Sequence, residues 1–83
     1  MRVNVKFFAI LRERLNAPSL DLDLPEGATV AVAIERLSTL HPAIGSMLER
    51  SAFAVNRAYS ARDTMLRDKD ELAIIPPVSG GIA

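Results

Sequence analysis

The chain has 83 residues, of which 49% are hydrophobic and 24% are charged, and it contains no cysteine. This length allows one small domain with a modest core and no deep enclosed active site, so a function has to reside on a surface or a tail. Ten basic and ten acidic residues give a net charge of zero, which argues against a partner that is nucleic acid or an anionic membrane. The lack of cysteine excludes disulfides, thiolate metal sites and a cysteine nucleophile.

The beginning of the sequence does not have the pattern of a targeting segment. Residues 2–7 alternate polar and apolar side chains, whereas a signal peptide has a continuous apolar core. No apolar stretch approaches the ~20 residues that cross a bilayer. Together with the absence of cysteine, this pattern predicts a cytoplasmic protein.

The first third of the chain predicts two strands and a short helix. Residues 3–7 alternate apolar and polar side chains, as in a strand with one buried face. Helix formers occupy residues 9–15 and predict one or two helical turns. Alternation returns over residues 19–24 until Pro25 ends it, so we expect a second strand antiparallel to the first.

The main helix is predicted over about 11 residues, numbers 30–40. Apolar side chains recur there at helical spacing, Thr29 can cap the N-terminus, and His41 followed by proline closes the helix. Residues 43–50 are expected to form a short second helix or an ordered loop.

Three further strand segments follow. One begins at Phe53, turns at residues 56–57 and resumes at Tyr59. Residues 68–70 predict a tight turn into the last strand, residues 71–75, whose side chains alternate between two faces. The element order predicts an α+β domain over residues 1–75: the ubiquitin-like roll, or β-grasp fold, with a mixed sheet of about four to five strands crossed by one helix. The first and last strands are expected to be parallel neighbours at its centre.

The last eight residues, 76–83, read PPVSGGIA and predict an extended tail. Two prolines lack amide donors and end the strand ladder. A glycine pair near a chain end commonly belongs to a frayed terminus. It can also pass through a narrow channel and present a carboxyl group there. The stiff proline spacer and the ubiquitin-like pattern before it favour the second interpretation.

Five segments in order resemble the small, sulfur-carrying subunit of molybdopterin synthase, the MoaD family, and the resemblance runs to residue 81. The tail motif is the most specific of them. The segments are Val5 to Ala9, Leu11 to Glu13, Ala54 to Asn56, Asp68 to Ala73 and Pro76 to Gly81.

The resemblance implies a protein-bound cosubstrate that has no catalytic residues of its own and binds no cofactor or metal. An E1-like activating enzyme, similar to MoeB, would use ATP to adenylate the carboxyl group of Gly81, which follows Gly80. A sulfur donor such as a cysteine desulfurase would then supply the sulfur of a thiocarboxylate. The tail would enter the large, MoaE-like subunit of the synthase and donate sulfur to cyclic pyranopterin monophosphate in molybdenum cofactor biosynthesis.

A docking surface is predicted beside the tail. Phe8 and Ile75 are expected on the sheet face opposite the core, near Tyr59, and a contiguous apolar patch of this kind is typical of an interface. Scattered exposed apolar residues are the alternative. Arg12 and Arg57 are candidate rim contacts, although solvated surface is the more ordinary role for each. The tail residues expected in the interface are Pro76, Pro77, Val78 and Ser79.

Other polar residues have ordinary structural interpretations. The single histidine, His41, precedes a proline at a helix end and has no partner at triad spacing. Residues 21 and 23 lie on the solvent face of a strand, and Asp68 and Asp70 belong to a turn, so metal binding is not favoured for either acidic pair.

Two features depart from the family pattern. The turn before the last strand usually has glycine where Lys69 stands, so either this lysine takes a positive φ at a cost of about 1 kcal/mol or the turn is of another type. In addition, Ile82 and Ala83 follow Gly81, so the carboxyl group that the chemistry needs is bound in the peptide bond to Ile82. A protease removes them, or they belong to a fusion, or this copy is inactive; we favour removal.

Three rival functions remain open. A ThiS-like carrier for thiamine thiazole synthesis would use the same chemistry, but such chains tend to be shorter and to lack the proline pair. A ubiquitin-like protein modifier would form conjugates with lysines. A non-catalytic interaction module would tolerate deletion of Gly80 and Gly81.

Overall fold

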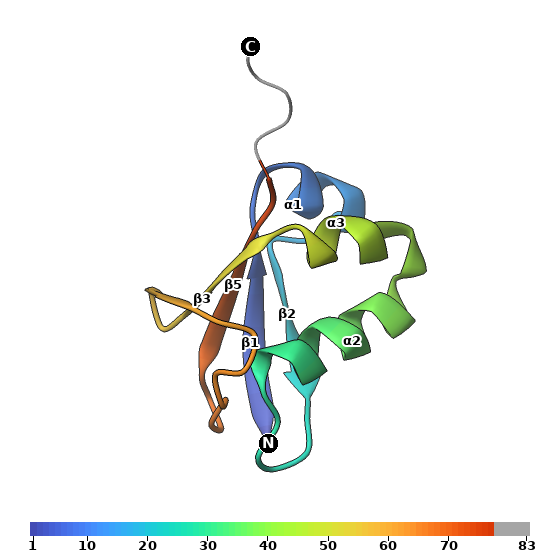
Figure 1. Ribbon diagram of the computed structural model, residues 1–83. Coiled ribbons are helices and arrows are strands. Elements are labelled where there is room, and N and C mark those ends of the chain that lie inside the picture. The colour runs from blue at the N-terminus through green and yellow to red at the C-terminus, as the bar shows by residue number, and fades with distance from the viewer. Residues whose placement is uncertain (78–83) are drawn as a thin grey trace.

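The computed structural model describes residues 1–77 and contains one mixed sheet with helices on one of its faces (Figure 1). Its elements follow the predicted order. They are β1 (Arg2–Phe7), α1 (Ala9–Leu15), β2 (Ser19–Asp23), α2 (Val30–Leu40), the 3-10 turn η1 (Pro42–Ile44), α3 (Gly45–Glu49), β3 (Ala52–Val55), β4 (Ala58–Ser60) and β5 (Glu71–Ile75).

The sheet has five strands in the order β2-β1-β5-β3-β4. β1 pairs with β2 in antiparallel and with β5 in parallel orientation, and β3 is antiparallel to both β5 and β4. The predicted parallel pair at the centre is therefore confirmed. Because β1 and β5 run in the same direction, β5 ends at the end of the sheet where α1 begins, far from the N-terminus (Figure 1).

The core lies between the sheet and α2. The alternating residues of β1 and β5 that point inward, among them Val5 and Leu72, are fully buried, and so are Ile34 and Leu37 on α2. The side chain of Thr29 accepts a hydrogen bond from the N–H of Val32 at 3.4 Å, which confirms the predicted cap. Burial of apolar area on this scale is the main force that holds such a small domain together.

The structure tests several predictions about helix ends and turns. α1 ends where Asn16 takes a left-handed conformation. Residues 42–49 are helical, so of the two alternatives predicted for residues 43–50 the short helix is the one present. Lys69 has a φ of 71°, so the alternative of another turn type is wrong and the lysine does carry the strained conformation. Its N–H donates to the carbonyl of Arg2 at 2.7 Å, which holds the turn against the start of β1.

The longest helix, α2, has 11 residues, so within residues 1–77 no helix could cross a bilayer. The last strand ends at Ile75, and Pro76 and Pro77 follow without regular structure. The end of β5 is the one predicted for the last strand, residues 71–75. The rest of the tail, residues 78–83, lies outside the described part of the chain.

Candidate functional site

The face of the sheet opposite α2 carries a shallow depression of about 410 Å³. It is bordered by residues of β1, β5, β3 and β4, which are neighbours in this order across the sheet, by the residue that follows β1 and by one residue of the β3–β4 turn. The lining residues are Lys6, Phe8, Ala54, Arg57, Tyr59, Glu71, Ala73 and Ile75.

The register of the strands explains why the depression forms. Lys6 is paired with Ala73, Ala73 with Ala54, and Ala54 with Tyr59, so these four residues form one row across the sheet. Residues directly opposite each other on paired strands share a face. The two alanines in the middle of the row have only a methyl group, and they form the low floor of the depression.

Large apolar side chains stand around this floor. Phe8 is 43% exposed and Tyr59 is 79% exposed, while Ile75 is half-buried. Phe8 directly follows β1, and Ile75 ends its parallel neighbour β5, so these two residues lie at the end of the sheet from which the tail departs. Tyr59 lies on β4, beside Ala54. The predicted gathering of Phe8, Tyr59 and Ile75 on one surface is therefore present in the structure.

The charged residues of the depression differ in how they are partnered. The Nζ atom of Lys6 lies 3.3 Å from Oε2 of Glu71, so these two charges largely offset each other. Arg57 is exposed and forms no ion pair or side-chain hydrogen bond with any residue in the range 1–77. Arg12 lines a neighbouring depression of about 340 Å³ that shares Lys6 and Phe8 with the first.

Sequence reasoning missed four members of this surface: Lys6, Ala54, Glu71 and Ala73. Strand alternation placed Ala73 on the face of Ile75, but which residues of other strands stand beside it depends on register. Pro76 and Pro77 do not line the depression, and four predicted site residues lie outside the described part of the chain. These are Val78, Ser79, Gly80 and Gly81.

The acidic pairs hold loops and strands in place. Asp21 accepts a hydrogen bond from Asn4, and Asp23 accepts one from Nε of Arg2 at 3.2 Å. This bond from Arg2 to Asp23 raises the pKa of the guanidinium group. Among residues 1–77, no three histidine, aspartate or glutamate side chains approach one another as metal ligands would.

Asp68, Asp70 and His41 also have structural partners. Asp68 accepts a hydrogen bond from the N–H of Arg2, and Asp70 accepts one from the N–H of Arg67, at 2.7 and 2.8 Å. The N–H of His41 donates to the carbonyl of Leu37 at the end of α2. The structural interpretations of these residues are therefore supported.

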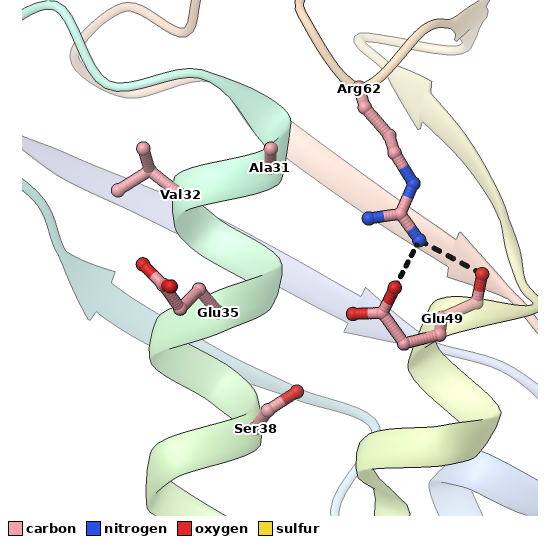
Figure 2. A pocket seen from close by; sticks show the side chains of 6 residues that line it. All are labelled: Ala31, Val32, Glu35, Ser38, Glu49 and Arg62. Atoms are coloured by element: carbon pink, nitrogen blue, oxygen red, sulfur yellow. Dashed lines mark hydrogen bonds and ion pairs between the residues drawn. The ribbon is translucent and has the colours of Figure 1, made fainter.

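A second groove lies on the helix-bearing side, between α2, α3 and the segment after β4 (Figure 2). Arg62 dominates it: one guanidinium nitrogen donates to both the carbonyl and the carboxylate of Glu49, each at 2.9 Å. The same guanidinium lies 5.5 Å from the ring centroid of Phe53. Because this nitrogen and the π face of the guanidinium are engaged within the domain, Arg62 fastens α3 to the segment after β4.

The chain is similar to a known protein family over most of its length. The model of the ThiS family matches residues 5–81, which is nearly the whole chain and ends at the second glycine. The chain belongs to the ThiS family. Ile82 and Ala83 lie beyond the match.

Two curated relatives carry the same name, molybdopterin synthase sulfur carrier subunit. The protein from Dictyostelium discoideum is 41% identical over 80 residues and covers 93% of each chain. The one from Arabidopsis thaliana is 33% identical over 81 residues, which are 98% of this chain and 84% of the relative. The resemblance to molybdopterin synthase small subunits is thereby confirmed.

The fold of this chain is similar to that of a solved structure of a related protein. Small archaeal modifier protein 1 from Methanosarcina acetivorans is 30% identical, covers 96% of each chain and superposes with a TM-score of 0.82. The ubiquitin-like, β-grasp architecture predicted from the sequence is confirmed.

Proposed function

We propose that this chain is the sulfur carrier subunit of a molybdopterin synthase. The observation that carries the proposal is the near full-length similarity to sulfur carrier subunits. The match to the family model ends at Gly81. A domain with an exposed apolar surface beside the start of a tail that contains a glycine pair suits a carrier that visits successive enzymes. We expect it to work in the cytoplasm, because proteins of this reducing compartment do not depend on disulfides and this chain has no cysteine.

The chemistry takes place on the carboxyl group of Gly81. A free carboxylate is a poor acyl donor, so an ATP-dependent, E1-like enzyme joins its oxygen to the α-phosphate of ATP and releases pyrophosphate. A persulfide carried by a donor such as a cysteine desulfurase then attacks the acyl carbon and AMP leaves, which gives an acyl disulfide. A thiol cleaves the S–S bond of this intermediate, forms a disulfide with the donor cysteine and releases the thiocarboxylate. This chain needs no cofactor of its own for any of these steps.

The folded part of the chain delivers that group. The apolar border formed by Phe8, Tyr59 and Ile75 docks on the large subunit, and residues 76–81 extend into its pocket. At about 3.3 Å per residue, this tail reaches at most roughly 20 Å. The large subunit supplies the catalytic groups, and the sulfur passes to cyclic pyranopterin monophosphate.

Residues 82 and 83 have to be removed before this chemistry can begin. In the sequence, the carboxyl group of Gly81 forms a peptide bond with Ile82, and a branched side chain does not pass where glycine does. We propose that a protease cleaves after Gly81. Cleavage after Gly81 is the step that turns the chain into a competent carrier.

Intact mass spectrometry of the protein from its native cell tests processing and activity together. The expected species ends at Gly81 and has one carboxyl oxygen replaced by sulfur. A matched strain that expresses Gly81→Val should show no sulfur-containing species and should lose cofactor-dependent oxidoreductase activity. Recovery of the wild-type chain only with Ile82 and Ala83 attached, under sulfur-replete conditions, would contradict the proposal.

A second candidate function is protein modification. It is favoured by the similarity to small archaeal modifier protein 1 at 30% identity over 96% of the chain. This function predicts isopeptide bonds between Gly81 and lysines of other proteins in cell extracts. Proteomic digestion that finds the thiocarboxylate but no such branched peptides would exclude it.

A further inference from the structure

The β3–β4 turn contains an arginine where the backbone geometry favours glycine. Val55 pairs with Ala58, so Asn56 and Arg57 form a two-residue hairpin loop. Their φ angles are 50° and 72°, which is the type I′ turn. Asparagine suits the first position of this turn, whereas the second normally has glycine because a side chain is strained at positive φ. Arg57 therefore occupies this position at a cost to the fold.

This turn is fixed in place before any partner arrives. The Nδ2 atom of Asn56 donates to Asp70 at 2.9 Å, and its Oδ1 atom accepts from the N–H of Glu71 at 3.0 Å. The N–H of Asn56 also donates to the carbonyl of Glu71 at 2.8 Å. Three hydrogen bonds thus anchor the loop to the start of β5. Because the backbone of this loop is already ordered, binding of a partner to the side chain of Arg57 costs less conformational entropy.

Arg57 is also the uncompensated charge of the depression. Of the three charged residues that line it, Lys6 and Glu71 pair with each other at 3.3 Å. Arg57 forms no ion pair within residues 1–77, so the depression has an excess of one positive charge on the side of the β3–β4 turn. An apolar surface with a positive charge at its rim is complementary to an apolar surface with a carboxylate at its rim.

We propose that Arg57 is a specificity-determining contact of the docking surface and that the protein which covers the depression places a carboxylate opposite it. This inference rests on the proposed function, in which the covering protein is the large subunit of the synthase. The backbone strain at Arg57, its anchored loop and its unpaired charge all concern one residue at the border of the depression. A solvated arginine would account for the unpaired charge, but not for its place at a strained position of an anchored turn.

Association with the large subunit from the same organism tests the contact. The variants are Arg57→Gln and Arg57→Glu, and the matched control is Arg14→Glu, because Arg14 is an exposed arginine on α1 that lines neither depression. Kinetics are measured by surface plasmon resonance at low and at physiological salt. Rim charges act mainly on the association rate and on its salt dependence.

We expect the charge reversal at Arg57 to weaken binding about tenfold and the neutral variant about threefold, mostly through slower association. The charge reversal should also flatten the salt dependence of the association rate, whereas Arg14→Glu should behave like the wild type. Equal effects of the two charge reversals would overturn the inference and leave the proposed function standing. If the wild-type chain does not bind the large subunit, the proposed function and the inference both fall.

A glycine variant separates contact from fold. Arg57→Gly removes the strained side chain, so it should raise the midpoint of thermal unfolding and at the same time weaken association as much as Arg57→Gln does. A purely structural role would not move stability and binding in opposite directions. A glycine variant that binds like the wild type would overturn the proposed contact, and one that melts at a lower temperature would overturn the strain argument.

Discussion

Truncation of Phe8 tests whether the outer face of the sheet is a docking surface. The side chain is 43% exposed. An aromatic side chain of ~200 Å² then leaves about 85 Å² for a partner to cover, which is worth about 2 kcal/mol at ~25 cal/mol per Å². Phe8→Ala should therefore raise the dissociation constant of the complex with the large subunit by about 30-fold.

The assay is isothermal titration calorimetry of the purified subunits, with Leu40→Ala as the matched control. Leu40 is 55% exposed at the end of α2, outside the depression, and its truncation removes a similar apolar area. Since Phe8 is not part of the buried core, thermal unfolding should change little in either variant. The reasoning is refuted if the two variants bind equally well, or if Phe8→Ala binds as tightly as the wild type.

Three predictions concern stability. Lys69→Gly relieves a positive φ and should raise the free energy of unfolding by about 0.5–1 kcal/mol, which thermal melts would register as a rise of roughly 3–6 °C. Asn56→Ala removes both side-chain hydrogen bonds between the β3–β4 turn and β5 and should cost about 1–2 kcal/mol in urea titrations; an unchanged midpoint would contradict the anchoring role. Leu37→Ala empties a fully buried position on α2 and should cost about 2–5 kcal/mol, a large part of what a domain of this size has.

The secondary structure could be predicted because each element carries its own period. The alternation in residues 2–7 and 71–75 places every second side chain in the core, and the helical spacing in residues 30–40 does the same for α2. These patterns also indicated the face on which Phe8 and Ile75 lie. Local sequence was sufficient there because one buried face fixes the orientation of a strand.

The lining of the depression could not be predicted in the same way. It depends on which residues of β3 and β4 stand beside β5, and register between strands far apart in the sequence is set by turns and packing. The left-handed conformation of Arg57 was equally hidden, because arginine does not indicate positive φ, whereas that of Lys69 was one of two alternatives that the family pattern left open. The hydrogen bond between Arg62 and Glu49 joins two surface segments, and no periodic pattern in the sequence indicates it.

The outer face of the central strands lacks the cover that the inner face has. Here α2 covers the inner face of β1 and β5, while the outer face presents Phe8, Ala73 and Ile75 without any covering element from residues 1–77. A sheet with antiparallel pairs, as this one has, can leave one face to water, so it is the apolar side chains on that face, and not the strand pairing, that give a reason to expect a partner. The two alanines of the floor leave space above the strands, and a bound protein that filled this space would bury Phe8 and Ile75. The same contact would hold Ile75 against the partner and so aim the tail that follows it.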